Sequence, residues 1–232
     1  KETGGNKTYK INFTKFLGGL RLGVTHSTGL KNASLYELYG NIGQKNINPE
    51  KSETNEIFGE YSLTENIKLF STAYRTRMKD RIKINSSWNA YENKVPDTTQ
   101  EGLENEIKWL TNNQSISLVS HFAKSRTSSN GPNSRRPDLS YGLDYLKKFN
   151  SSHYGPFDLN FSHRYIGDHI DWTGSKNEFV KSVDLIDMSI SKSLYGNIIS
   201  LNLTNLLNER YEKPGTYSQD GRMINFGFRR SY

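Results

Sequence analysis

The sequence predicts an all-β protein that forms a transmembrane, antiparallel, up-and-down β-barrel. Segments in which apolar and polar residues alternate recur along all 232 residues, and many exceed the usual soluble strand of about five or six residues. Their connections are alternately short and long. The composition is polar on average, with 33% hydrophobic residues, yet it includes 14 Tyr and 11 Phe. A wall with an aqueous interior and an apolar outer belt explains this combination.

The alternation predicts eleven strands, each suited to a tilted membrane span of about ten residues with an extension beyond the bilayer. In the segment 156–166, Phe157 and Leu159 share one face, whereas Asp158 and Asn160 share the other. The expected strands are 7–17, 19–28, 51–63, 66–84, 97–111, 114–127, 138–148, 156–170, 181–194, 197–210 and 221–232.

The connections predict the orientation of the wall. Every second connection of an up-and-down sheet lies at the same end, so all long loops are expected at one end and all short turns at the other. The expected turns are Gly18–Gly19, Thr64–Asn66, Asn112–Asn113, Tyr195–Asn197 and the slightly longer Phe149–Gly155. The expected long loops are 29–50, 85–96, 128–137, 171–180 and 211–220. In a barrel of the outer membrane of a Gram-negative bacterium, these loops are extracellular, and the turns and the C-terminus are periplasmic.

Several function classes find no support in the residues. The 31 Lys and Arg residues exceed the 24 Asp and Glu residues, which gives a net charge of +7. The basic residues are scattered along the chain, and this argues against a nucleic-acid partner. There is no Cys and no apolar run of about 18 residues. The segment Asp168–Asp171 fits no specific zinc spacing, so neither a metal nor another cofactor is expected. No nucleophile or phosphate-loop motif is present, so no enzyme is expected either.

Two segments near the N-terminus resemble the TonB-dependent outer-membrane receptors. Thr28 to Gly40 carries the pattern G-x-K-x-x-x-L-x-E-L-Y-G, and Asn46 to Glu56 carries N-x-N-P-E-K-S followed by a Glu-bearing strand. The resemblance extends over nearly the whole chain, through EGLENEIKWL at 101–110, RRPDLSYGLDY at 135–145 and NLTNLLNERYE at 202–212. The order and spacing are similar to those of cobalamin and siderophore receptors.

The resemblance implies a barrel of about 22 strands with a plug inside, of which residues 1–232 match the C-terminal eleven strands. The plug and the TonB box are then absent from this chain. Bacterial single-chain barrels have even strand numbers, so an expected count of eleven also indicates a fragment or a miscounted strand. The implied function is TonB-dependent uptake of a scarce, bulky nutrient: a ferric siderophore, haem or a cobalamin. The implied partners are this ligand, the TonB system acting through the plug, the barrel-assembly machinery, and outer-membrane lipid with lipopolysaccharide.

The candidate ligand-vestibule residues are aromatic and basic residues of the long loops. Such residues either contact the ligand or pack the loop onto the barrel rim. Arg135 and Arg136 suit a phosphate or carboxylate, including lipopolysaccharide phosphates, or form a solvated strand start closed by Pro137. The full set is Tyr36, Tyr39, Arg135, Arg136 and Tyr217. Charges of the strands, such as Glu56, Glu60, Glu104, Glu106 and Lys108, are expected to face the lumen.

The C-terminal segment INFGFRRSY resembles the assembly signal of outer-membrane barrels, with Gly227, Phe228 and Tyr232 as the matching residues. Arg230 departs from the pattern, which requires an apolar residue there. Two other readings stay open: a plug-less outer-membrane pore or adhesin, and a soluble β-barrel that binds a ligand or polyanion.

Overall fold

The computed structural model describes residues 7–93, 96–127, 134–172, 177–213 and 217–230. Within them, eleven strands form one sheet in the order β1-β2-β3-β4-β7-β8-β9-β10-β13-β14-β15, so neighbours in the sheet follow the chain. This confirms the eleven expected strands. They are β1 (Lys10–Leu17), β2 (Leu20–Lys31), β3 (Glu50–Ser62), β4 (Ile67–Lys79), β7 (Thr98–Leu110), β8 (Gln114–Thr127), β9 (Leu139–Ser151), β10 (Gly155–Ile166), β13 (Val183–Leu194), β14 (Asn197–Thr204) and β15 (Met223–Arg230).

The remaining elements lie in the long loops. They are α1 (Leu35–Tyr39), the paired strands β5 (Lys83–Ile84) and β6 (Tyr91–Glu92), and the paired strands β11 (His169–Trp172) and β12 (Asn177–Val180). No described helix has the length and apolar character needed to span a bilayer.

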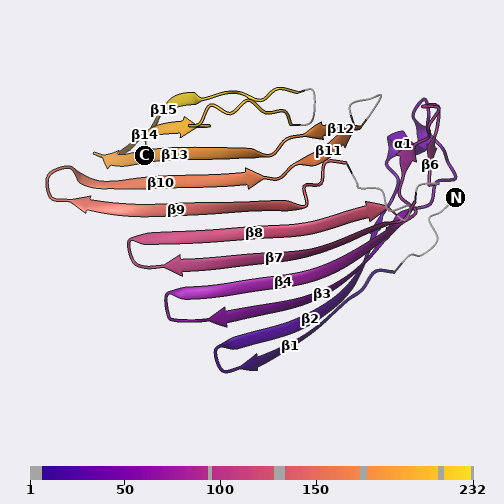
Figure 1. Cartoon of the computed structure of the whole chain (residues 1–232), viewed down its shortest axis with the longest axis horizontal. Helices are drawn as coiled ribbons and strands as arrows, with labels where there is room; N and C mark the ends of the chain where they lie inside the picture. The colour runs from indigo at the N-terminus through magenta and orange to yellow at the C-terminus, as the bar shows by residue number, and fades with distance from the viewer. Residues whose placement is uncertain (1–6, 94–95, 128–133, 173–176, 214–216, 231–232) are drawn as a thin grey trace. The chain divides into compact units, whose positions relative to one another are not determined.

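Backbone contacts divide the chain into two compact units. One contains residues 1–59, 72–102 and 124–133, and the other contains 60–71, 103–123 and 134–232. In the second unit, the turns of β9–β10 and β13–β14 lie at one end of the strands and the β11–β12 pair lies at the other (Figure 1). Few described apolar side chains are buried, namely Ile82, Ala123, Val183 and Leu185, so the strand ladder rather than a central core holds each unit together.

Two of the short turns, β1–β2 and β13–β14, have the geometry of two-residue hairpins. Leu194 pairs with Asn197 around Tyr195 and Gly196, whose φ angles are 50° and 76°. Positive φ at both central residues defines the type I′ turn, which matches the twist of the flanking strands. The β1–β2 turn has positive φ at Gly18, where glycine carries no steric penalty.

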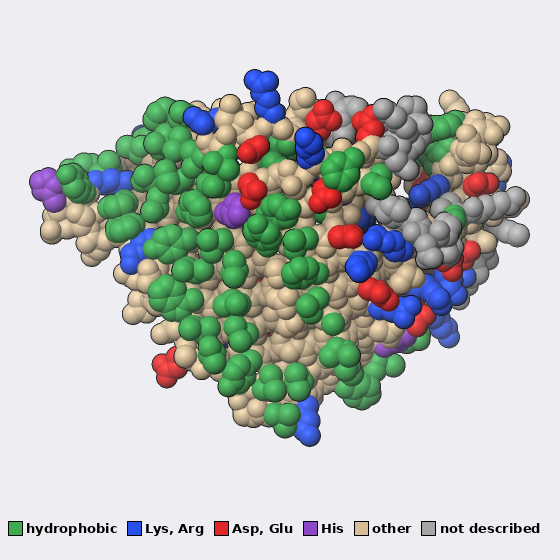
Figure 2. Space-filling view, viewed as in Figure 1, with side chains coloured by type: hydrophobic (Ala, Val, Ile, Leu, Met, Phe, Trp, Pro, Cys, Tyr) green, Lys and Arg blue, Asp and Glu red, His purple; other side chains and the backbone are tan. Residues whose placement is uncertain are grey.

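The two faces of the sheet separate as the alternation predicts. In the second unit, Phe161 pairs with Tyr145 on one side and with Met188 on the other, and Leu203 pairs with Met188 and Ile224. These residues form one apolar row on the face that we call the outer face. Figure 2 shows hydrophobic side chains gathered on this face over β9, β10 and β13. The intervening residues face the opposite, inner side, where polar side chains such as Asn160 and Ser189 form a second row.

Two aromatic pairs mark the ends of the apolar face. Phe149 stacks on Phe157 beside the β9–β10 turn, with ring centroids 4.6 Å apart, and Tyr141 stacks on Tyr165 near the long-loop end, also at 4.6 Å. The eight-residue interval from Phe157 to Tyr165 corresponds to about 27 Å along a strand. Outer-membrane barrels have aromatic girdles on an apolar band about 25 Å tall, so a tilted strand of this spacing matches the band.

Some expected strand boundaries are wrong, and two of the errors have a conformational cause. The strand expected at 66–84 ends at Lys79, because Asp80 adopts φ 54°. The strand expected at 197–210 ends at Thr204, because Asn205 adopts φ 50°. The strand expected at 156–170 is interrupted after Ile166, and its last residues belong to β11.

Candidate functional site

The first unit presents the aromatic patch of the β2–β3 loop on a capped helix. Ser34 Oγ accepts a hydrogen bond from the Glu37 backbone N–H at 3.2 Å, and Glu37 Oε2 accepts one from the Ser34 backbone N–H at 2.6 Å. This capping box fixes α1 as a short helix and leaves Tyr36 and Tyr39 exposed. The backbone hydrogen bond from Ser34 is the main reason that the pKa of Glu37 lies below its ordinary value, despite the opposing effect of burial.

The β4–β7 loop supports this helix. The Tyr91 ring on β6 meets the Tyr36 ring edge-on, with centroids 6.3 Å apart, and the Tyr91 backbone N–H donates to Ile42 O at 3.1 Å. Figure 1 shows α1 and β6 close together in this unit. Partial burial, with a contribution from the charge of Arg81, lowers the pKa of Lys83 on β5.

The side-chain amide of Asn93 also joins the two loops. Asn93 Oδ1 accepts from the Asn48 backbone N–H at 2.7 Å, and Asn93 Nδ2 donates to Asn48 O at 3.0 Å and to Asp80 O at 2.6 Å. The patch of α1 is therefore positioned by two loops that are distant in sequence.

The second unit holds a cavity of about 370 Å³ among its long loops. Apolar side chains of β10, β12 and β13 form part of the lining, including Ile166, Val180 and Val183. Basic lining residues are Arg135, Lys181 and Lys213, and acidic ones are Asp171 and Glu212. This mixture of apolar walls with a few charged groups is typical of a small-molecule pocket.

Arg135 is held firmly at the cavity wall. Its Nε donates to Asp171 Oδ1 at 2.6 Å, and its backbone N–H donates to Ile170 O at 2.7 Å. Asp171 is fully buried, whereas the Arg135 side chain is 59% exposed. The ion pair therefore compensates a buried carboxylate and also presents the guanidinium group to the cavity.

The other predicted vestibule residues lie apart from this ion pair. Arg136 is exposed and does not line the cavity, although its neighbour does. Tyr217 is exposed in the β14–β15 loop, where its carbonyl accepts from the Lys213 backbone N–H at 3.0 Å. The structure thus brings Tyr36 and Tyr39 together on one helix and places Arg135 on a cavity of the other unit.

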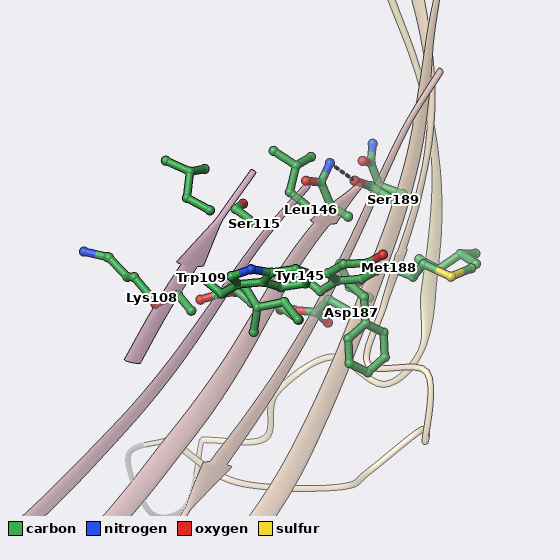
Figure 3. A pocket seen from close by; sticks show the side chains of 18 residues that line it. Lys108, Trp109, Ser115, Tyr145, Leu146, Asp187, Met188 and Ser189 are labelled. Atoms are coloured by element: carbon green, nitrogen blue, oxygen red, sulfur yellow. Dashed lines mark hydrogen bonds between the residues drawn. The ribbon is translucent and has the colours of Figure 1, made fainter. Parts of the chain in front are cut away.

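A larger hollow of about 500 Å³ lies on the wall of the second unit, across β7, β8, β9, β10, β13 and β14. In Figure 3, Trp109, Tyr145 and Met188 lie in one row across the strands, and Leu146 and Ser189 lie in a second row. The dashed line beside Ser189 is the hydrogen bond from Asn160 Nδ2 to Ser189 Oγ, at 3.2 Å.

Charges of the inner face are arranged in pairs. Glu106 contacts Lys108 Nζ at 2.9 Å and accepts from Ser117 Oγ at 2.8 Å. Arg164 Nη2 donates to Asp187 Oδ2, also at 2.9 Å. Two of the predicted lumen charges, Glu106 and Lys108, therefore belong to one hydrogen-bonded network. Paired charges and hydroxyl groups suit a hydrated surface.

The segment Asp168–Asp171 does not converge on a common point. Asp171 is paired with Arg135, and His169 Nδ1 lies 3.2 Å from Gly167 O. Within the described part of the chain, no three His, Cys, Asp or Glu side chains are grouped as metal ligands.

Asn93 and Asn205 organise the loops, and neither was recognised from the sequence. Asn205 is 6% exposed, donates from Nδ2 to the carbonyls of Glu209 and Asp220, and accepts the Glu209 backbone N–H at 2.9 Å. Asparagine adopts positive φ more readily than most residues. An Asn directly after an alternating segment is therefore the signal that could have identified Asn205.

Comparison with protein families gives one match that covers most of the chain. Residues 1–206 match the model described as "TonB dependent receptor-like, beta-barrel". Among curated proteins, the vitamin B12 transporter BtuB of Vibrio cholerae is 23% identical over 98% of this chain and 38% of its own length. This chain thus spans about two fifths of the length of the curated relatives that it matches.

Solved structures share the fold at lower identity. The siderophore receptor PirA from Acinetobacter baumannii superimposes with a TM-score of 0.80 and 15% identity, over 98% of this chain and 41% of its own. The ferripyoverdine receptor of Pseudomonas aeruginosa gives a TM-score of 0.77 and 15% identity, over 94% of this chain and 32% of its own.

Proposed function

This chain belongs to the TonB-dependent receptor-like β-barrel family, and we propose that it supplies part of the barrel wall of an outer-membrane receptor for nutrient uptake. The observation that carries the proposal is a family-matched sheet with an apolar outer face and a polar inner face. The whole receptor then takes up a scarce, bulky nutrient: a ferric siderophore, haem or a cobalamin.

The exposure of the outer face supports a membrane location. On β15 of the second unit, Ile224, Phe226 and Phe228 are 59%, 84% and 70% exposed, and on β1 of the first unit Phe13 is 70% exposed. A soluble protein seldom exposes so much contiguous apolar surface. Exposing apolar side chains to water costs free energy, and contact with lipid removes that cost. The exposed outer face therefore favours a membrane wall over a soluble ligand-binding barrel.

The loops supply the ligand contacts in this proposal. Tyr36 and Tyr39 offer exposed rings, and Arg135 offers a fixed guanidinium group to an acidic ligand. Arg136 and Tyr217 remain further candidate contacts. The long loops are then extracellular and the short turns periplasmic. The TonB system acts through a plug supplied elsewhere in the receptor.

We also propose that β15 carries the signal for the barrel-assembly machinery. Gly227 pairs with Ser200, and a Cβ at Gly227 would lie 2.4 Å from Ser200 Oγ. Phe228 lies on the outer face opposite Ile199, and the last candidate, Tyr232, lies outside the described residues. Arg230 lies at the end of β15 opposite Asn197, where a long side chain reaches the interface.

Uptake assays test the proposal. A strain that lacks the gene is compared with one that carries the full-length gene, using a ferric siderophore, haem and cobalamin in turn, with and without an energised TonB system. Gene- and TonB-dependent uptake of one of them is expected. Substituting Tyr39→Ala or Arg136→Ala is expected to raise the nutrient concentration that gives half-maximal uptake roughly 5-fold or more, because each removes a proposed ligand contact. Ion conductance without TonB-dependent uptake would instead identify a plug-less pore.

A further inference from the structure

A basic groove of about 280 Å³ lies on the outer face of the first unit. It is formed where β2, β3 and β4 approach their long loops and where the chain enters β1. Four cationic side chains line it, and Glu53 is its only acidic lining residue. The cations are Lys7, Lys51, Arg77 and Lys79.

The cations of the groove are poorly compensated. On β4, Arg75 contacts Glu101 at 3.1 Å, but Arg77 and Lys79 have no acidic partner within 4.0 Å among the described residues. Lys51 makes one long contact with Asp80, at 3.8 Å.

The register of β3 and β4 brings like charges together. Thr54 and Thr76 hydroxyls are 2.9 Å apart across the two strands. Counting outward from this pair places Glu53 near Arg77 and Lys51 near Lys79 on the outer face, so the like-charged pair is Lys51 and Lys79. Like charges on adjacent strands destabilise a sheet, so a bound anion would stabilise this arrangement.

The groove borders the apolar part of the same face. Along β2 the outer face passes from Thr28 to exposed Val24, and along β3 it passes from Lys51 to exposed Ile57. Figure 2 shows charged side chains gathered near the loop ends of β2–β4 and hydrophobic side chains farther along these strands. Tyr9 lies in the groove, and its hydroxyl contacts His26 Nε2 at 3.2 Å. Tyrosine is common at membrane interfaces.

We propose that this groove binds the phosphate groups of an outer-leaflet membrane lipid whose acyl chains lie on the adjacent apolar face. The inference rests on the proposed function, because it requires the outer face to contact lipid with its long-loop end outward. The sequence suggested Arg135 and Arg136 as a contact for lipopolysaccharide phosphates, but Arg135 already donates to Asp171. The proposal assigns the lipid phosphate contact to the groove on the outer face instead. Phosphate groups satisfy Arg77 and Lys79 as charge-assisted acceptors.

The test uses the full-length receptor extracted from outer membranes in mild detergent. Native mass spectrometry counts the phosphorylated lipids that remain bound as salt is raised. Arg77→Gln/Lys79→Gln is compared with the control Lys15→Gln/Arg75→Gln, which removes the same charge from the same face outside the groove. The groove variant is expected to retain lipid roughly tenfold more weakly, and the control to resemble the wild type.

Equal retention by the two double variants would overturn the lipid site. A second arm adds inorganic phosphate to delipidated receptor. Phosphate binding that depends on Arg77 and Lys79, without lipid retention, identifies a free-anion site and also overturns the proposal. Failure of the proposed function looks different: the wild-type receptor is then absent from the outer membrane or transports no nutrient.

Discussion

At the scale of single residues, short polar side chains determine where strands end and loops begin. Asn205 ends β14 by adopting positive φ, and its amide then bonds the backbone on both sides of the β14–β15 loop. Its own backbone N–H donates to Asp187 Oδ1 at 2.8 Å, and Asp187 is paired with Arg164. One asparagine thus links the inner-face charges to the loop conformation.

Replacing Asn205 with Ala should loosen this loop. The change removes the amide's hydrogen bonds and places at positive φ a residue that adopts this conformation less readily than Asn, so we expect a loss of roughly 2–4 kcal/mol of local stability. Limited proteolysis within 205–222 would then be faster at an unchanged protein level. Asn205→Gly restores the backbone freedom alone and should recover only part of the resistance. Wild-type resistance in the Ala variant would show that the amide contacts are dispensable.

Glu37 should make α1 sensitive to acid. Its folded pKa lies below the ordinary value of 4.5, so its stabilising effect is complete above 4.5 and disappears as the pH falls through the lowered pKa. Relative to Glu37→Ala, the wild type should protect residues 34–40 from hydrogen exchange by about 1 kcal/mol at neutral pH. That difference should vanish in acid. Glu37→Gln keeps a hydrogen-bonding cap without a charge, so the protection of its residues 34–40 should not change over this pH range. If the wild type stays better protected than Glu37→Ala by the same amount at every pH, the role of the Glu37 charge is contradicted.

At the scale of elements, the strands could be predicted because one face of each must contact a uniform apolar medium. That requirement leaves period-two alternation in the sequence, and all eleven strands of the main sheet carry it. The loop elements carry no such pattern. The helix α1 has five residues, and the cavity around Arg135 depends on the burial of Asp171 by distant segments. Sequence therefore indicated Arg135 as a candidate but not the ion pair that positions it.

The register of β15 gives a direct test of the two faces. Ile224 pairs with Leu203 on the apolar face, and its neighbour Asn225 pairs with Asn202 on the polar face. Substituting Ile224→Lys should destabilise the barrel by about 2–4 kcal/mol, because the charge enters lipid near the middle of the band. Asn225→Lys should be tolerated. The amount of folded, heat-modifiable receptor in outer membranes measures the effect of each substitution. Equal amounts would contradict the assignment of the faces, and a lower amount for Asn225→Lys would reverse it.

At the scale of the whole molecule, the proposed membrane orientation of the wall is the feature to test. The chain covers 38% of the length of its curated relative. Within the second unit, all short turns share one end and the loop strands β11 and β12 lie at the other. In the proposed receptor, the two ends face different compartments.

Cysteine labelling can test this orientation, because the chain contains no cysteine. Tyr217 in the β14–β15 loop and Tyr195 in the β13–β14 turn are 66% and 100% exposed, so a thiol at either position is accessible on its own side. A membrane-impermeant maleimide added to intact cells should label Tyr217→Cys and spare Tyr195→Cys in the full-length receptor, with any other cysteines replaced. Permeabilised cells should label both. Labelling of Tyr195→Cys but not Tyr217→Cys in intact cells would show that the wall has the opposite orientation. Labelling of both variants in intact cells would show that the loop and the turn do not lie in different compartments.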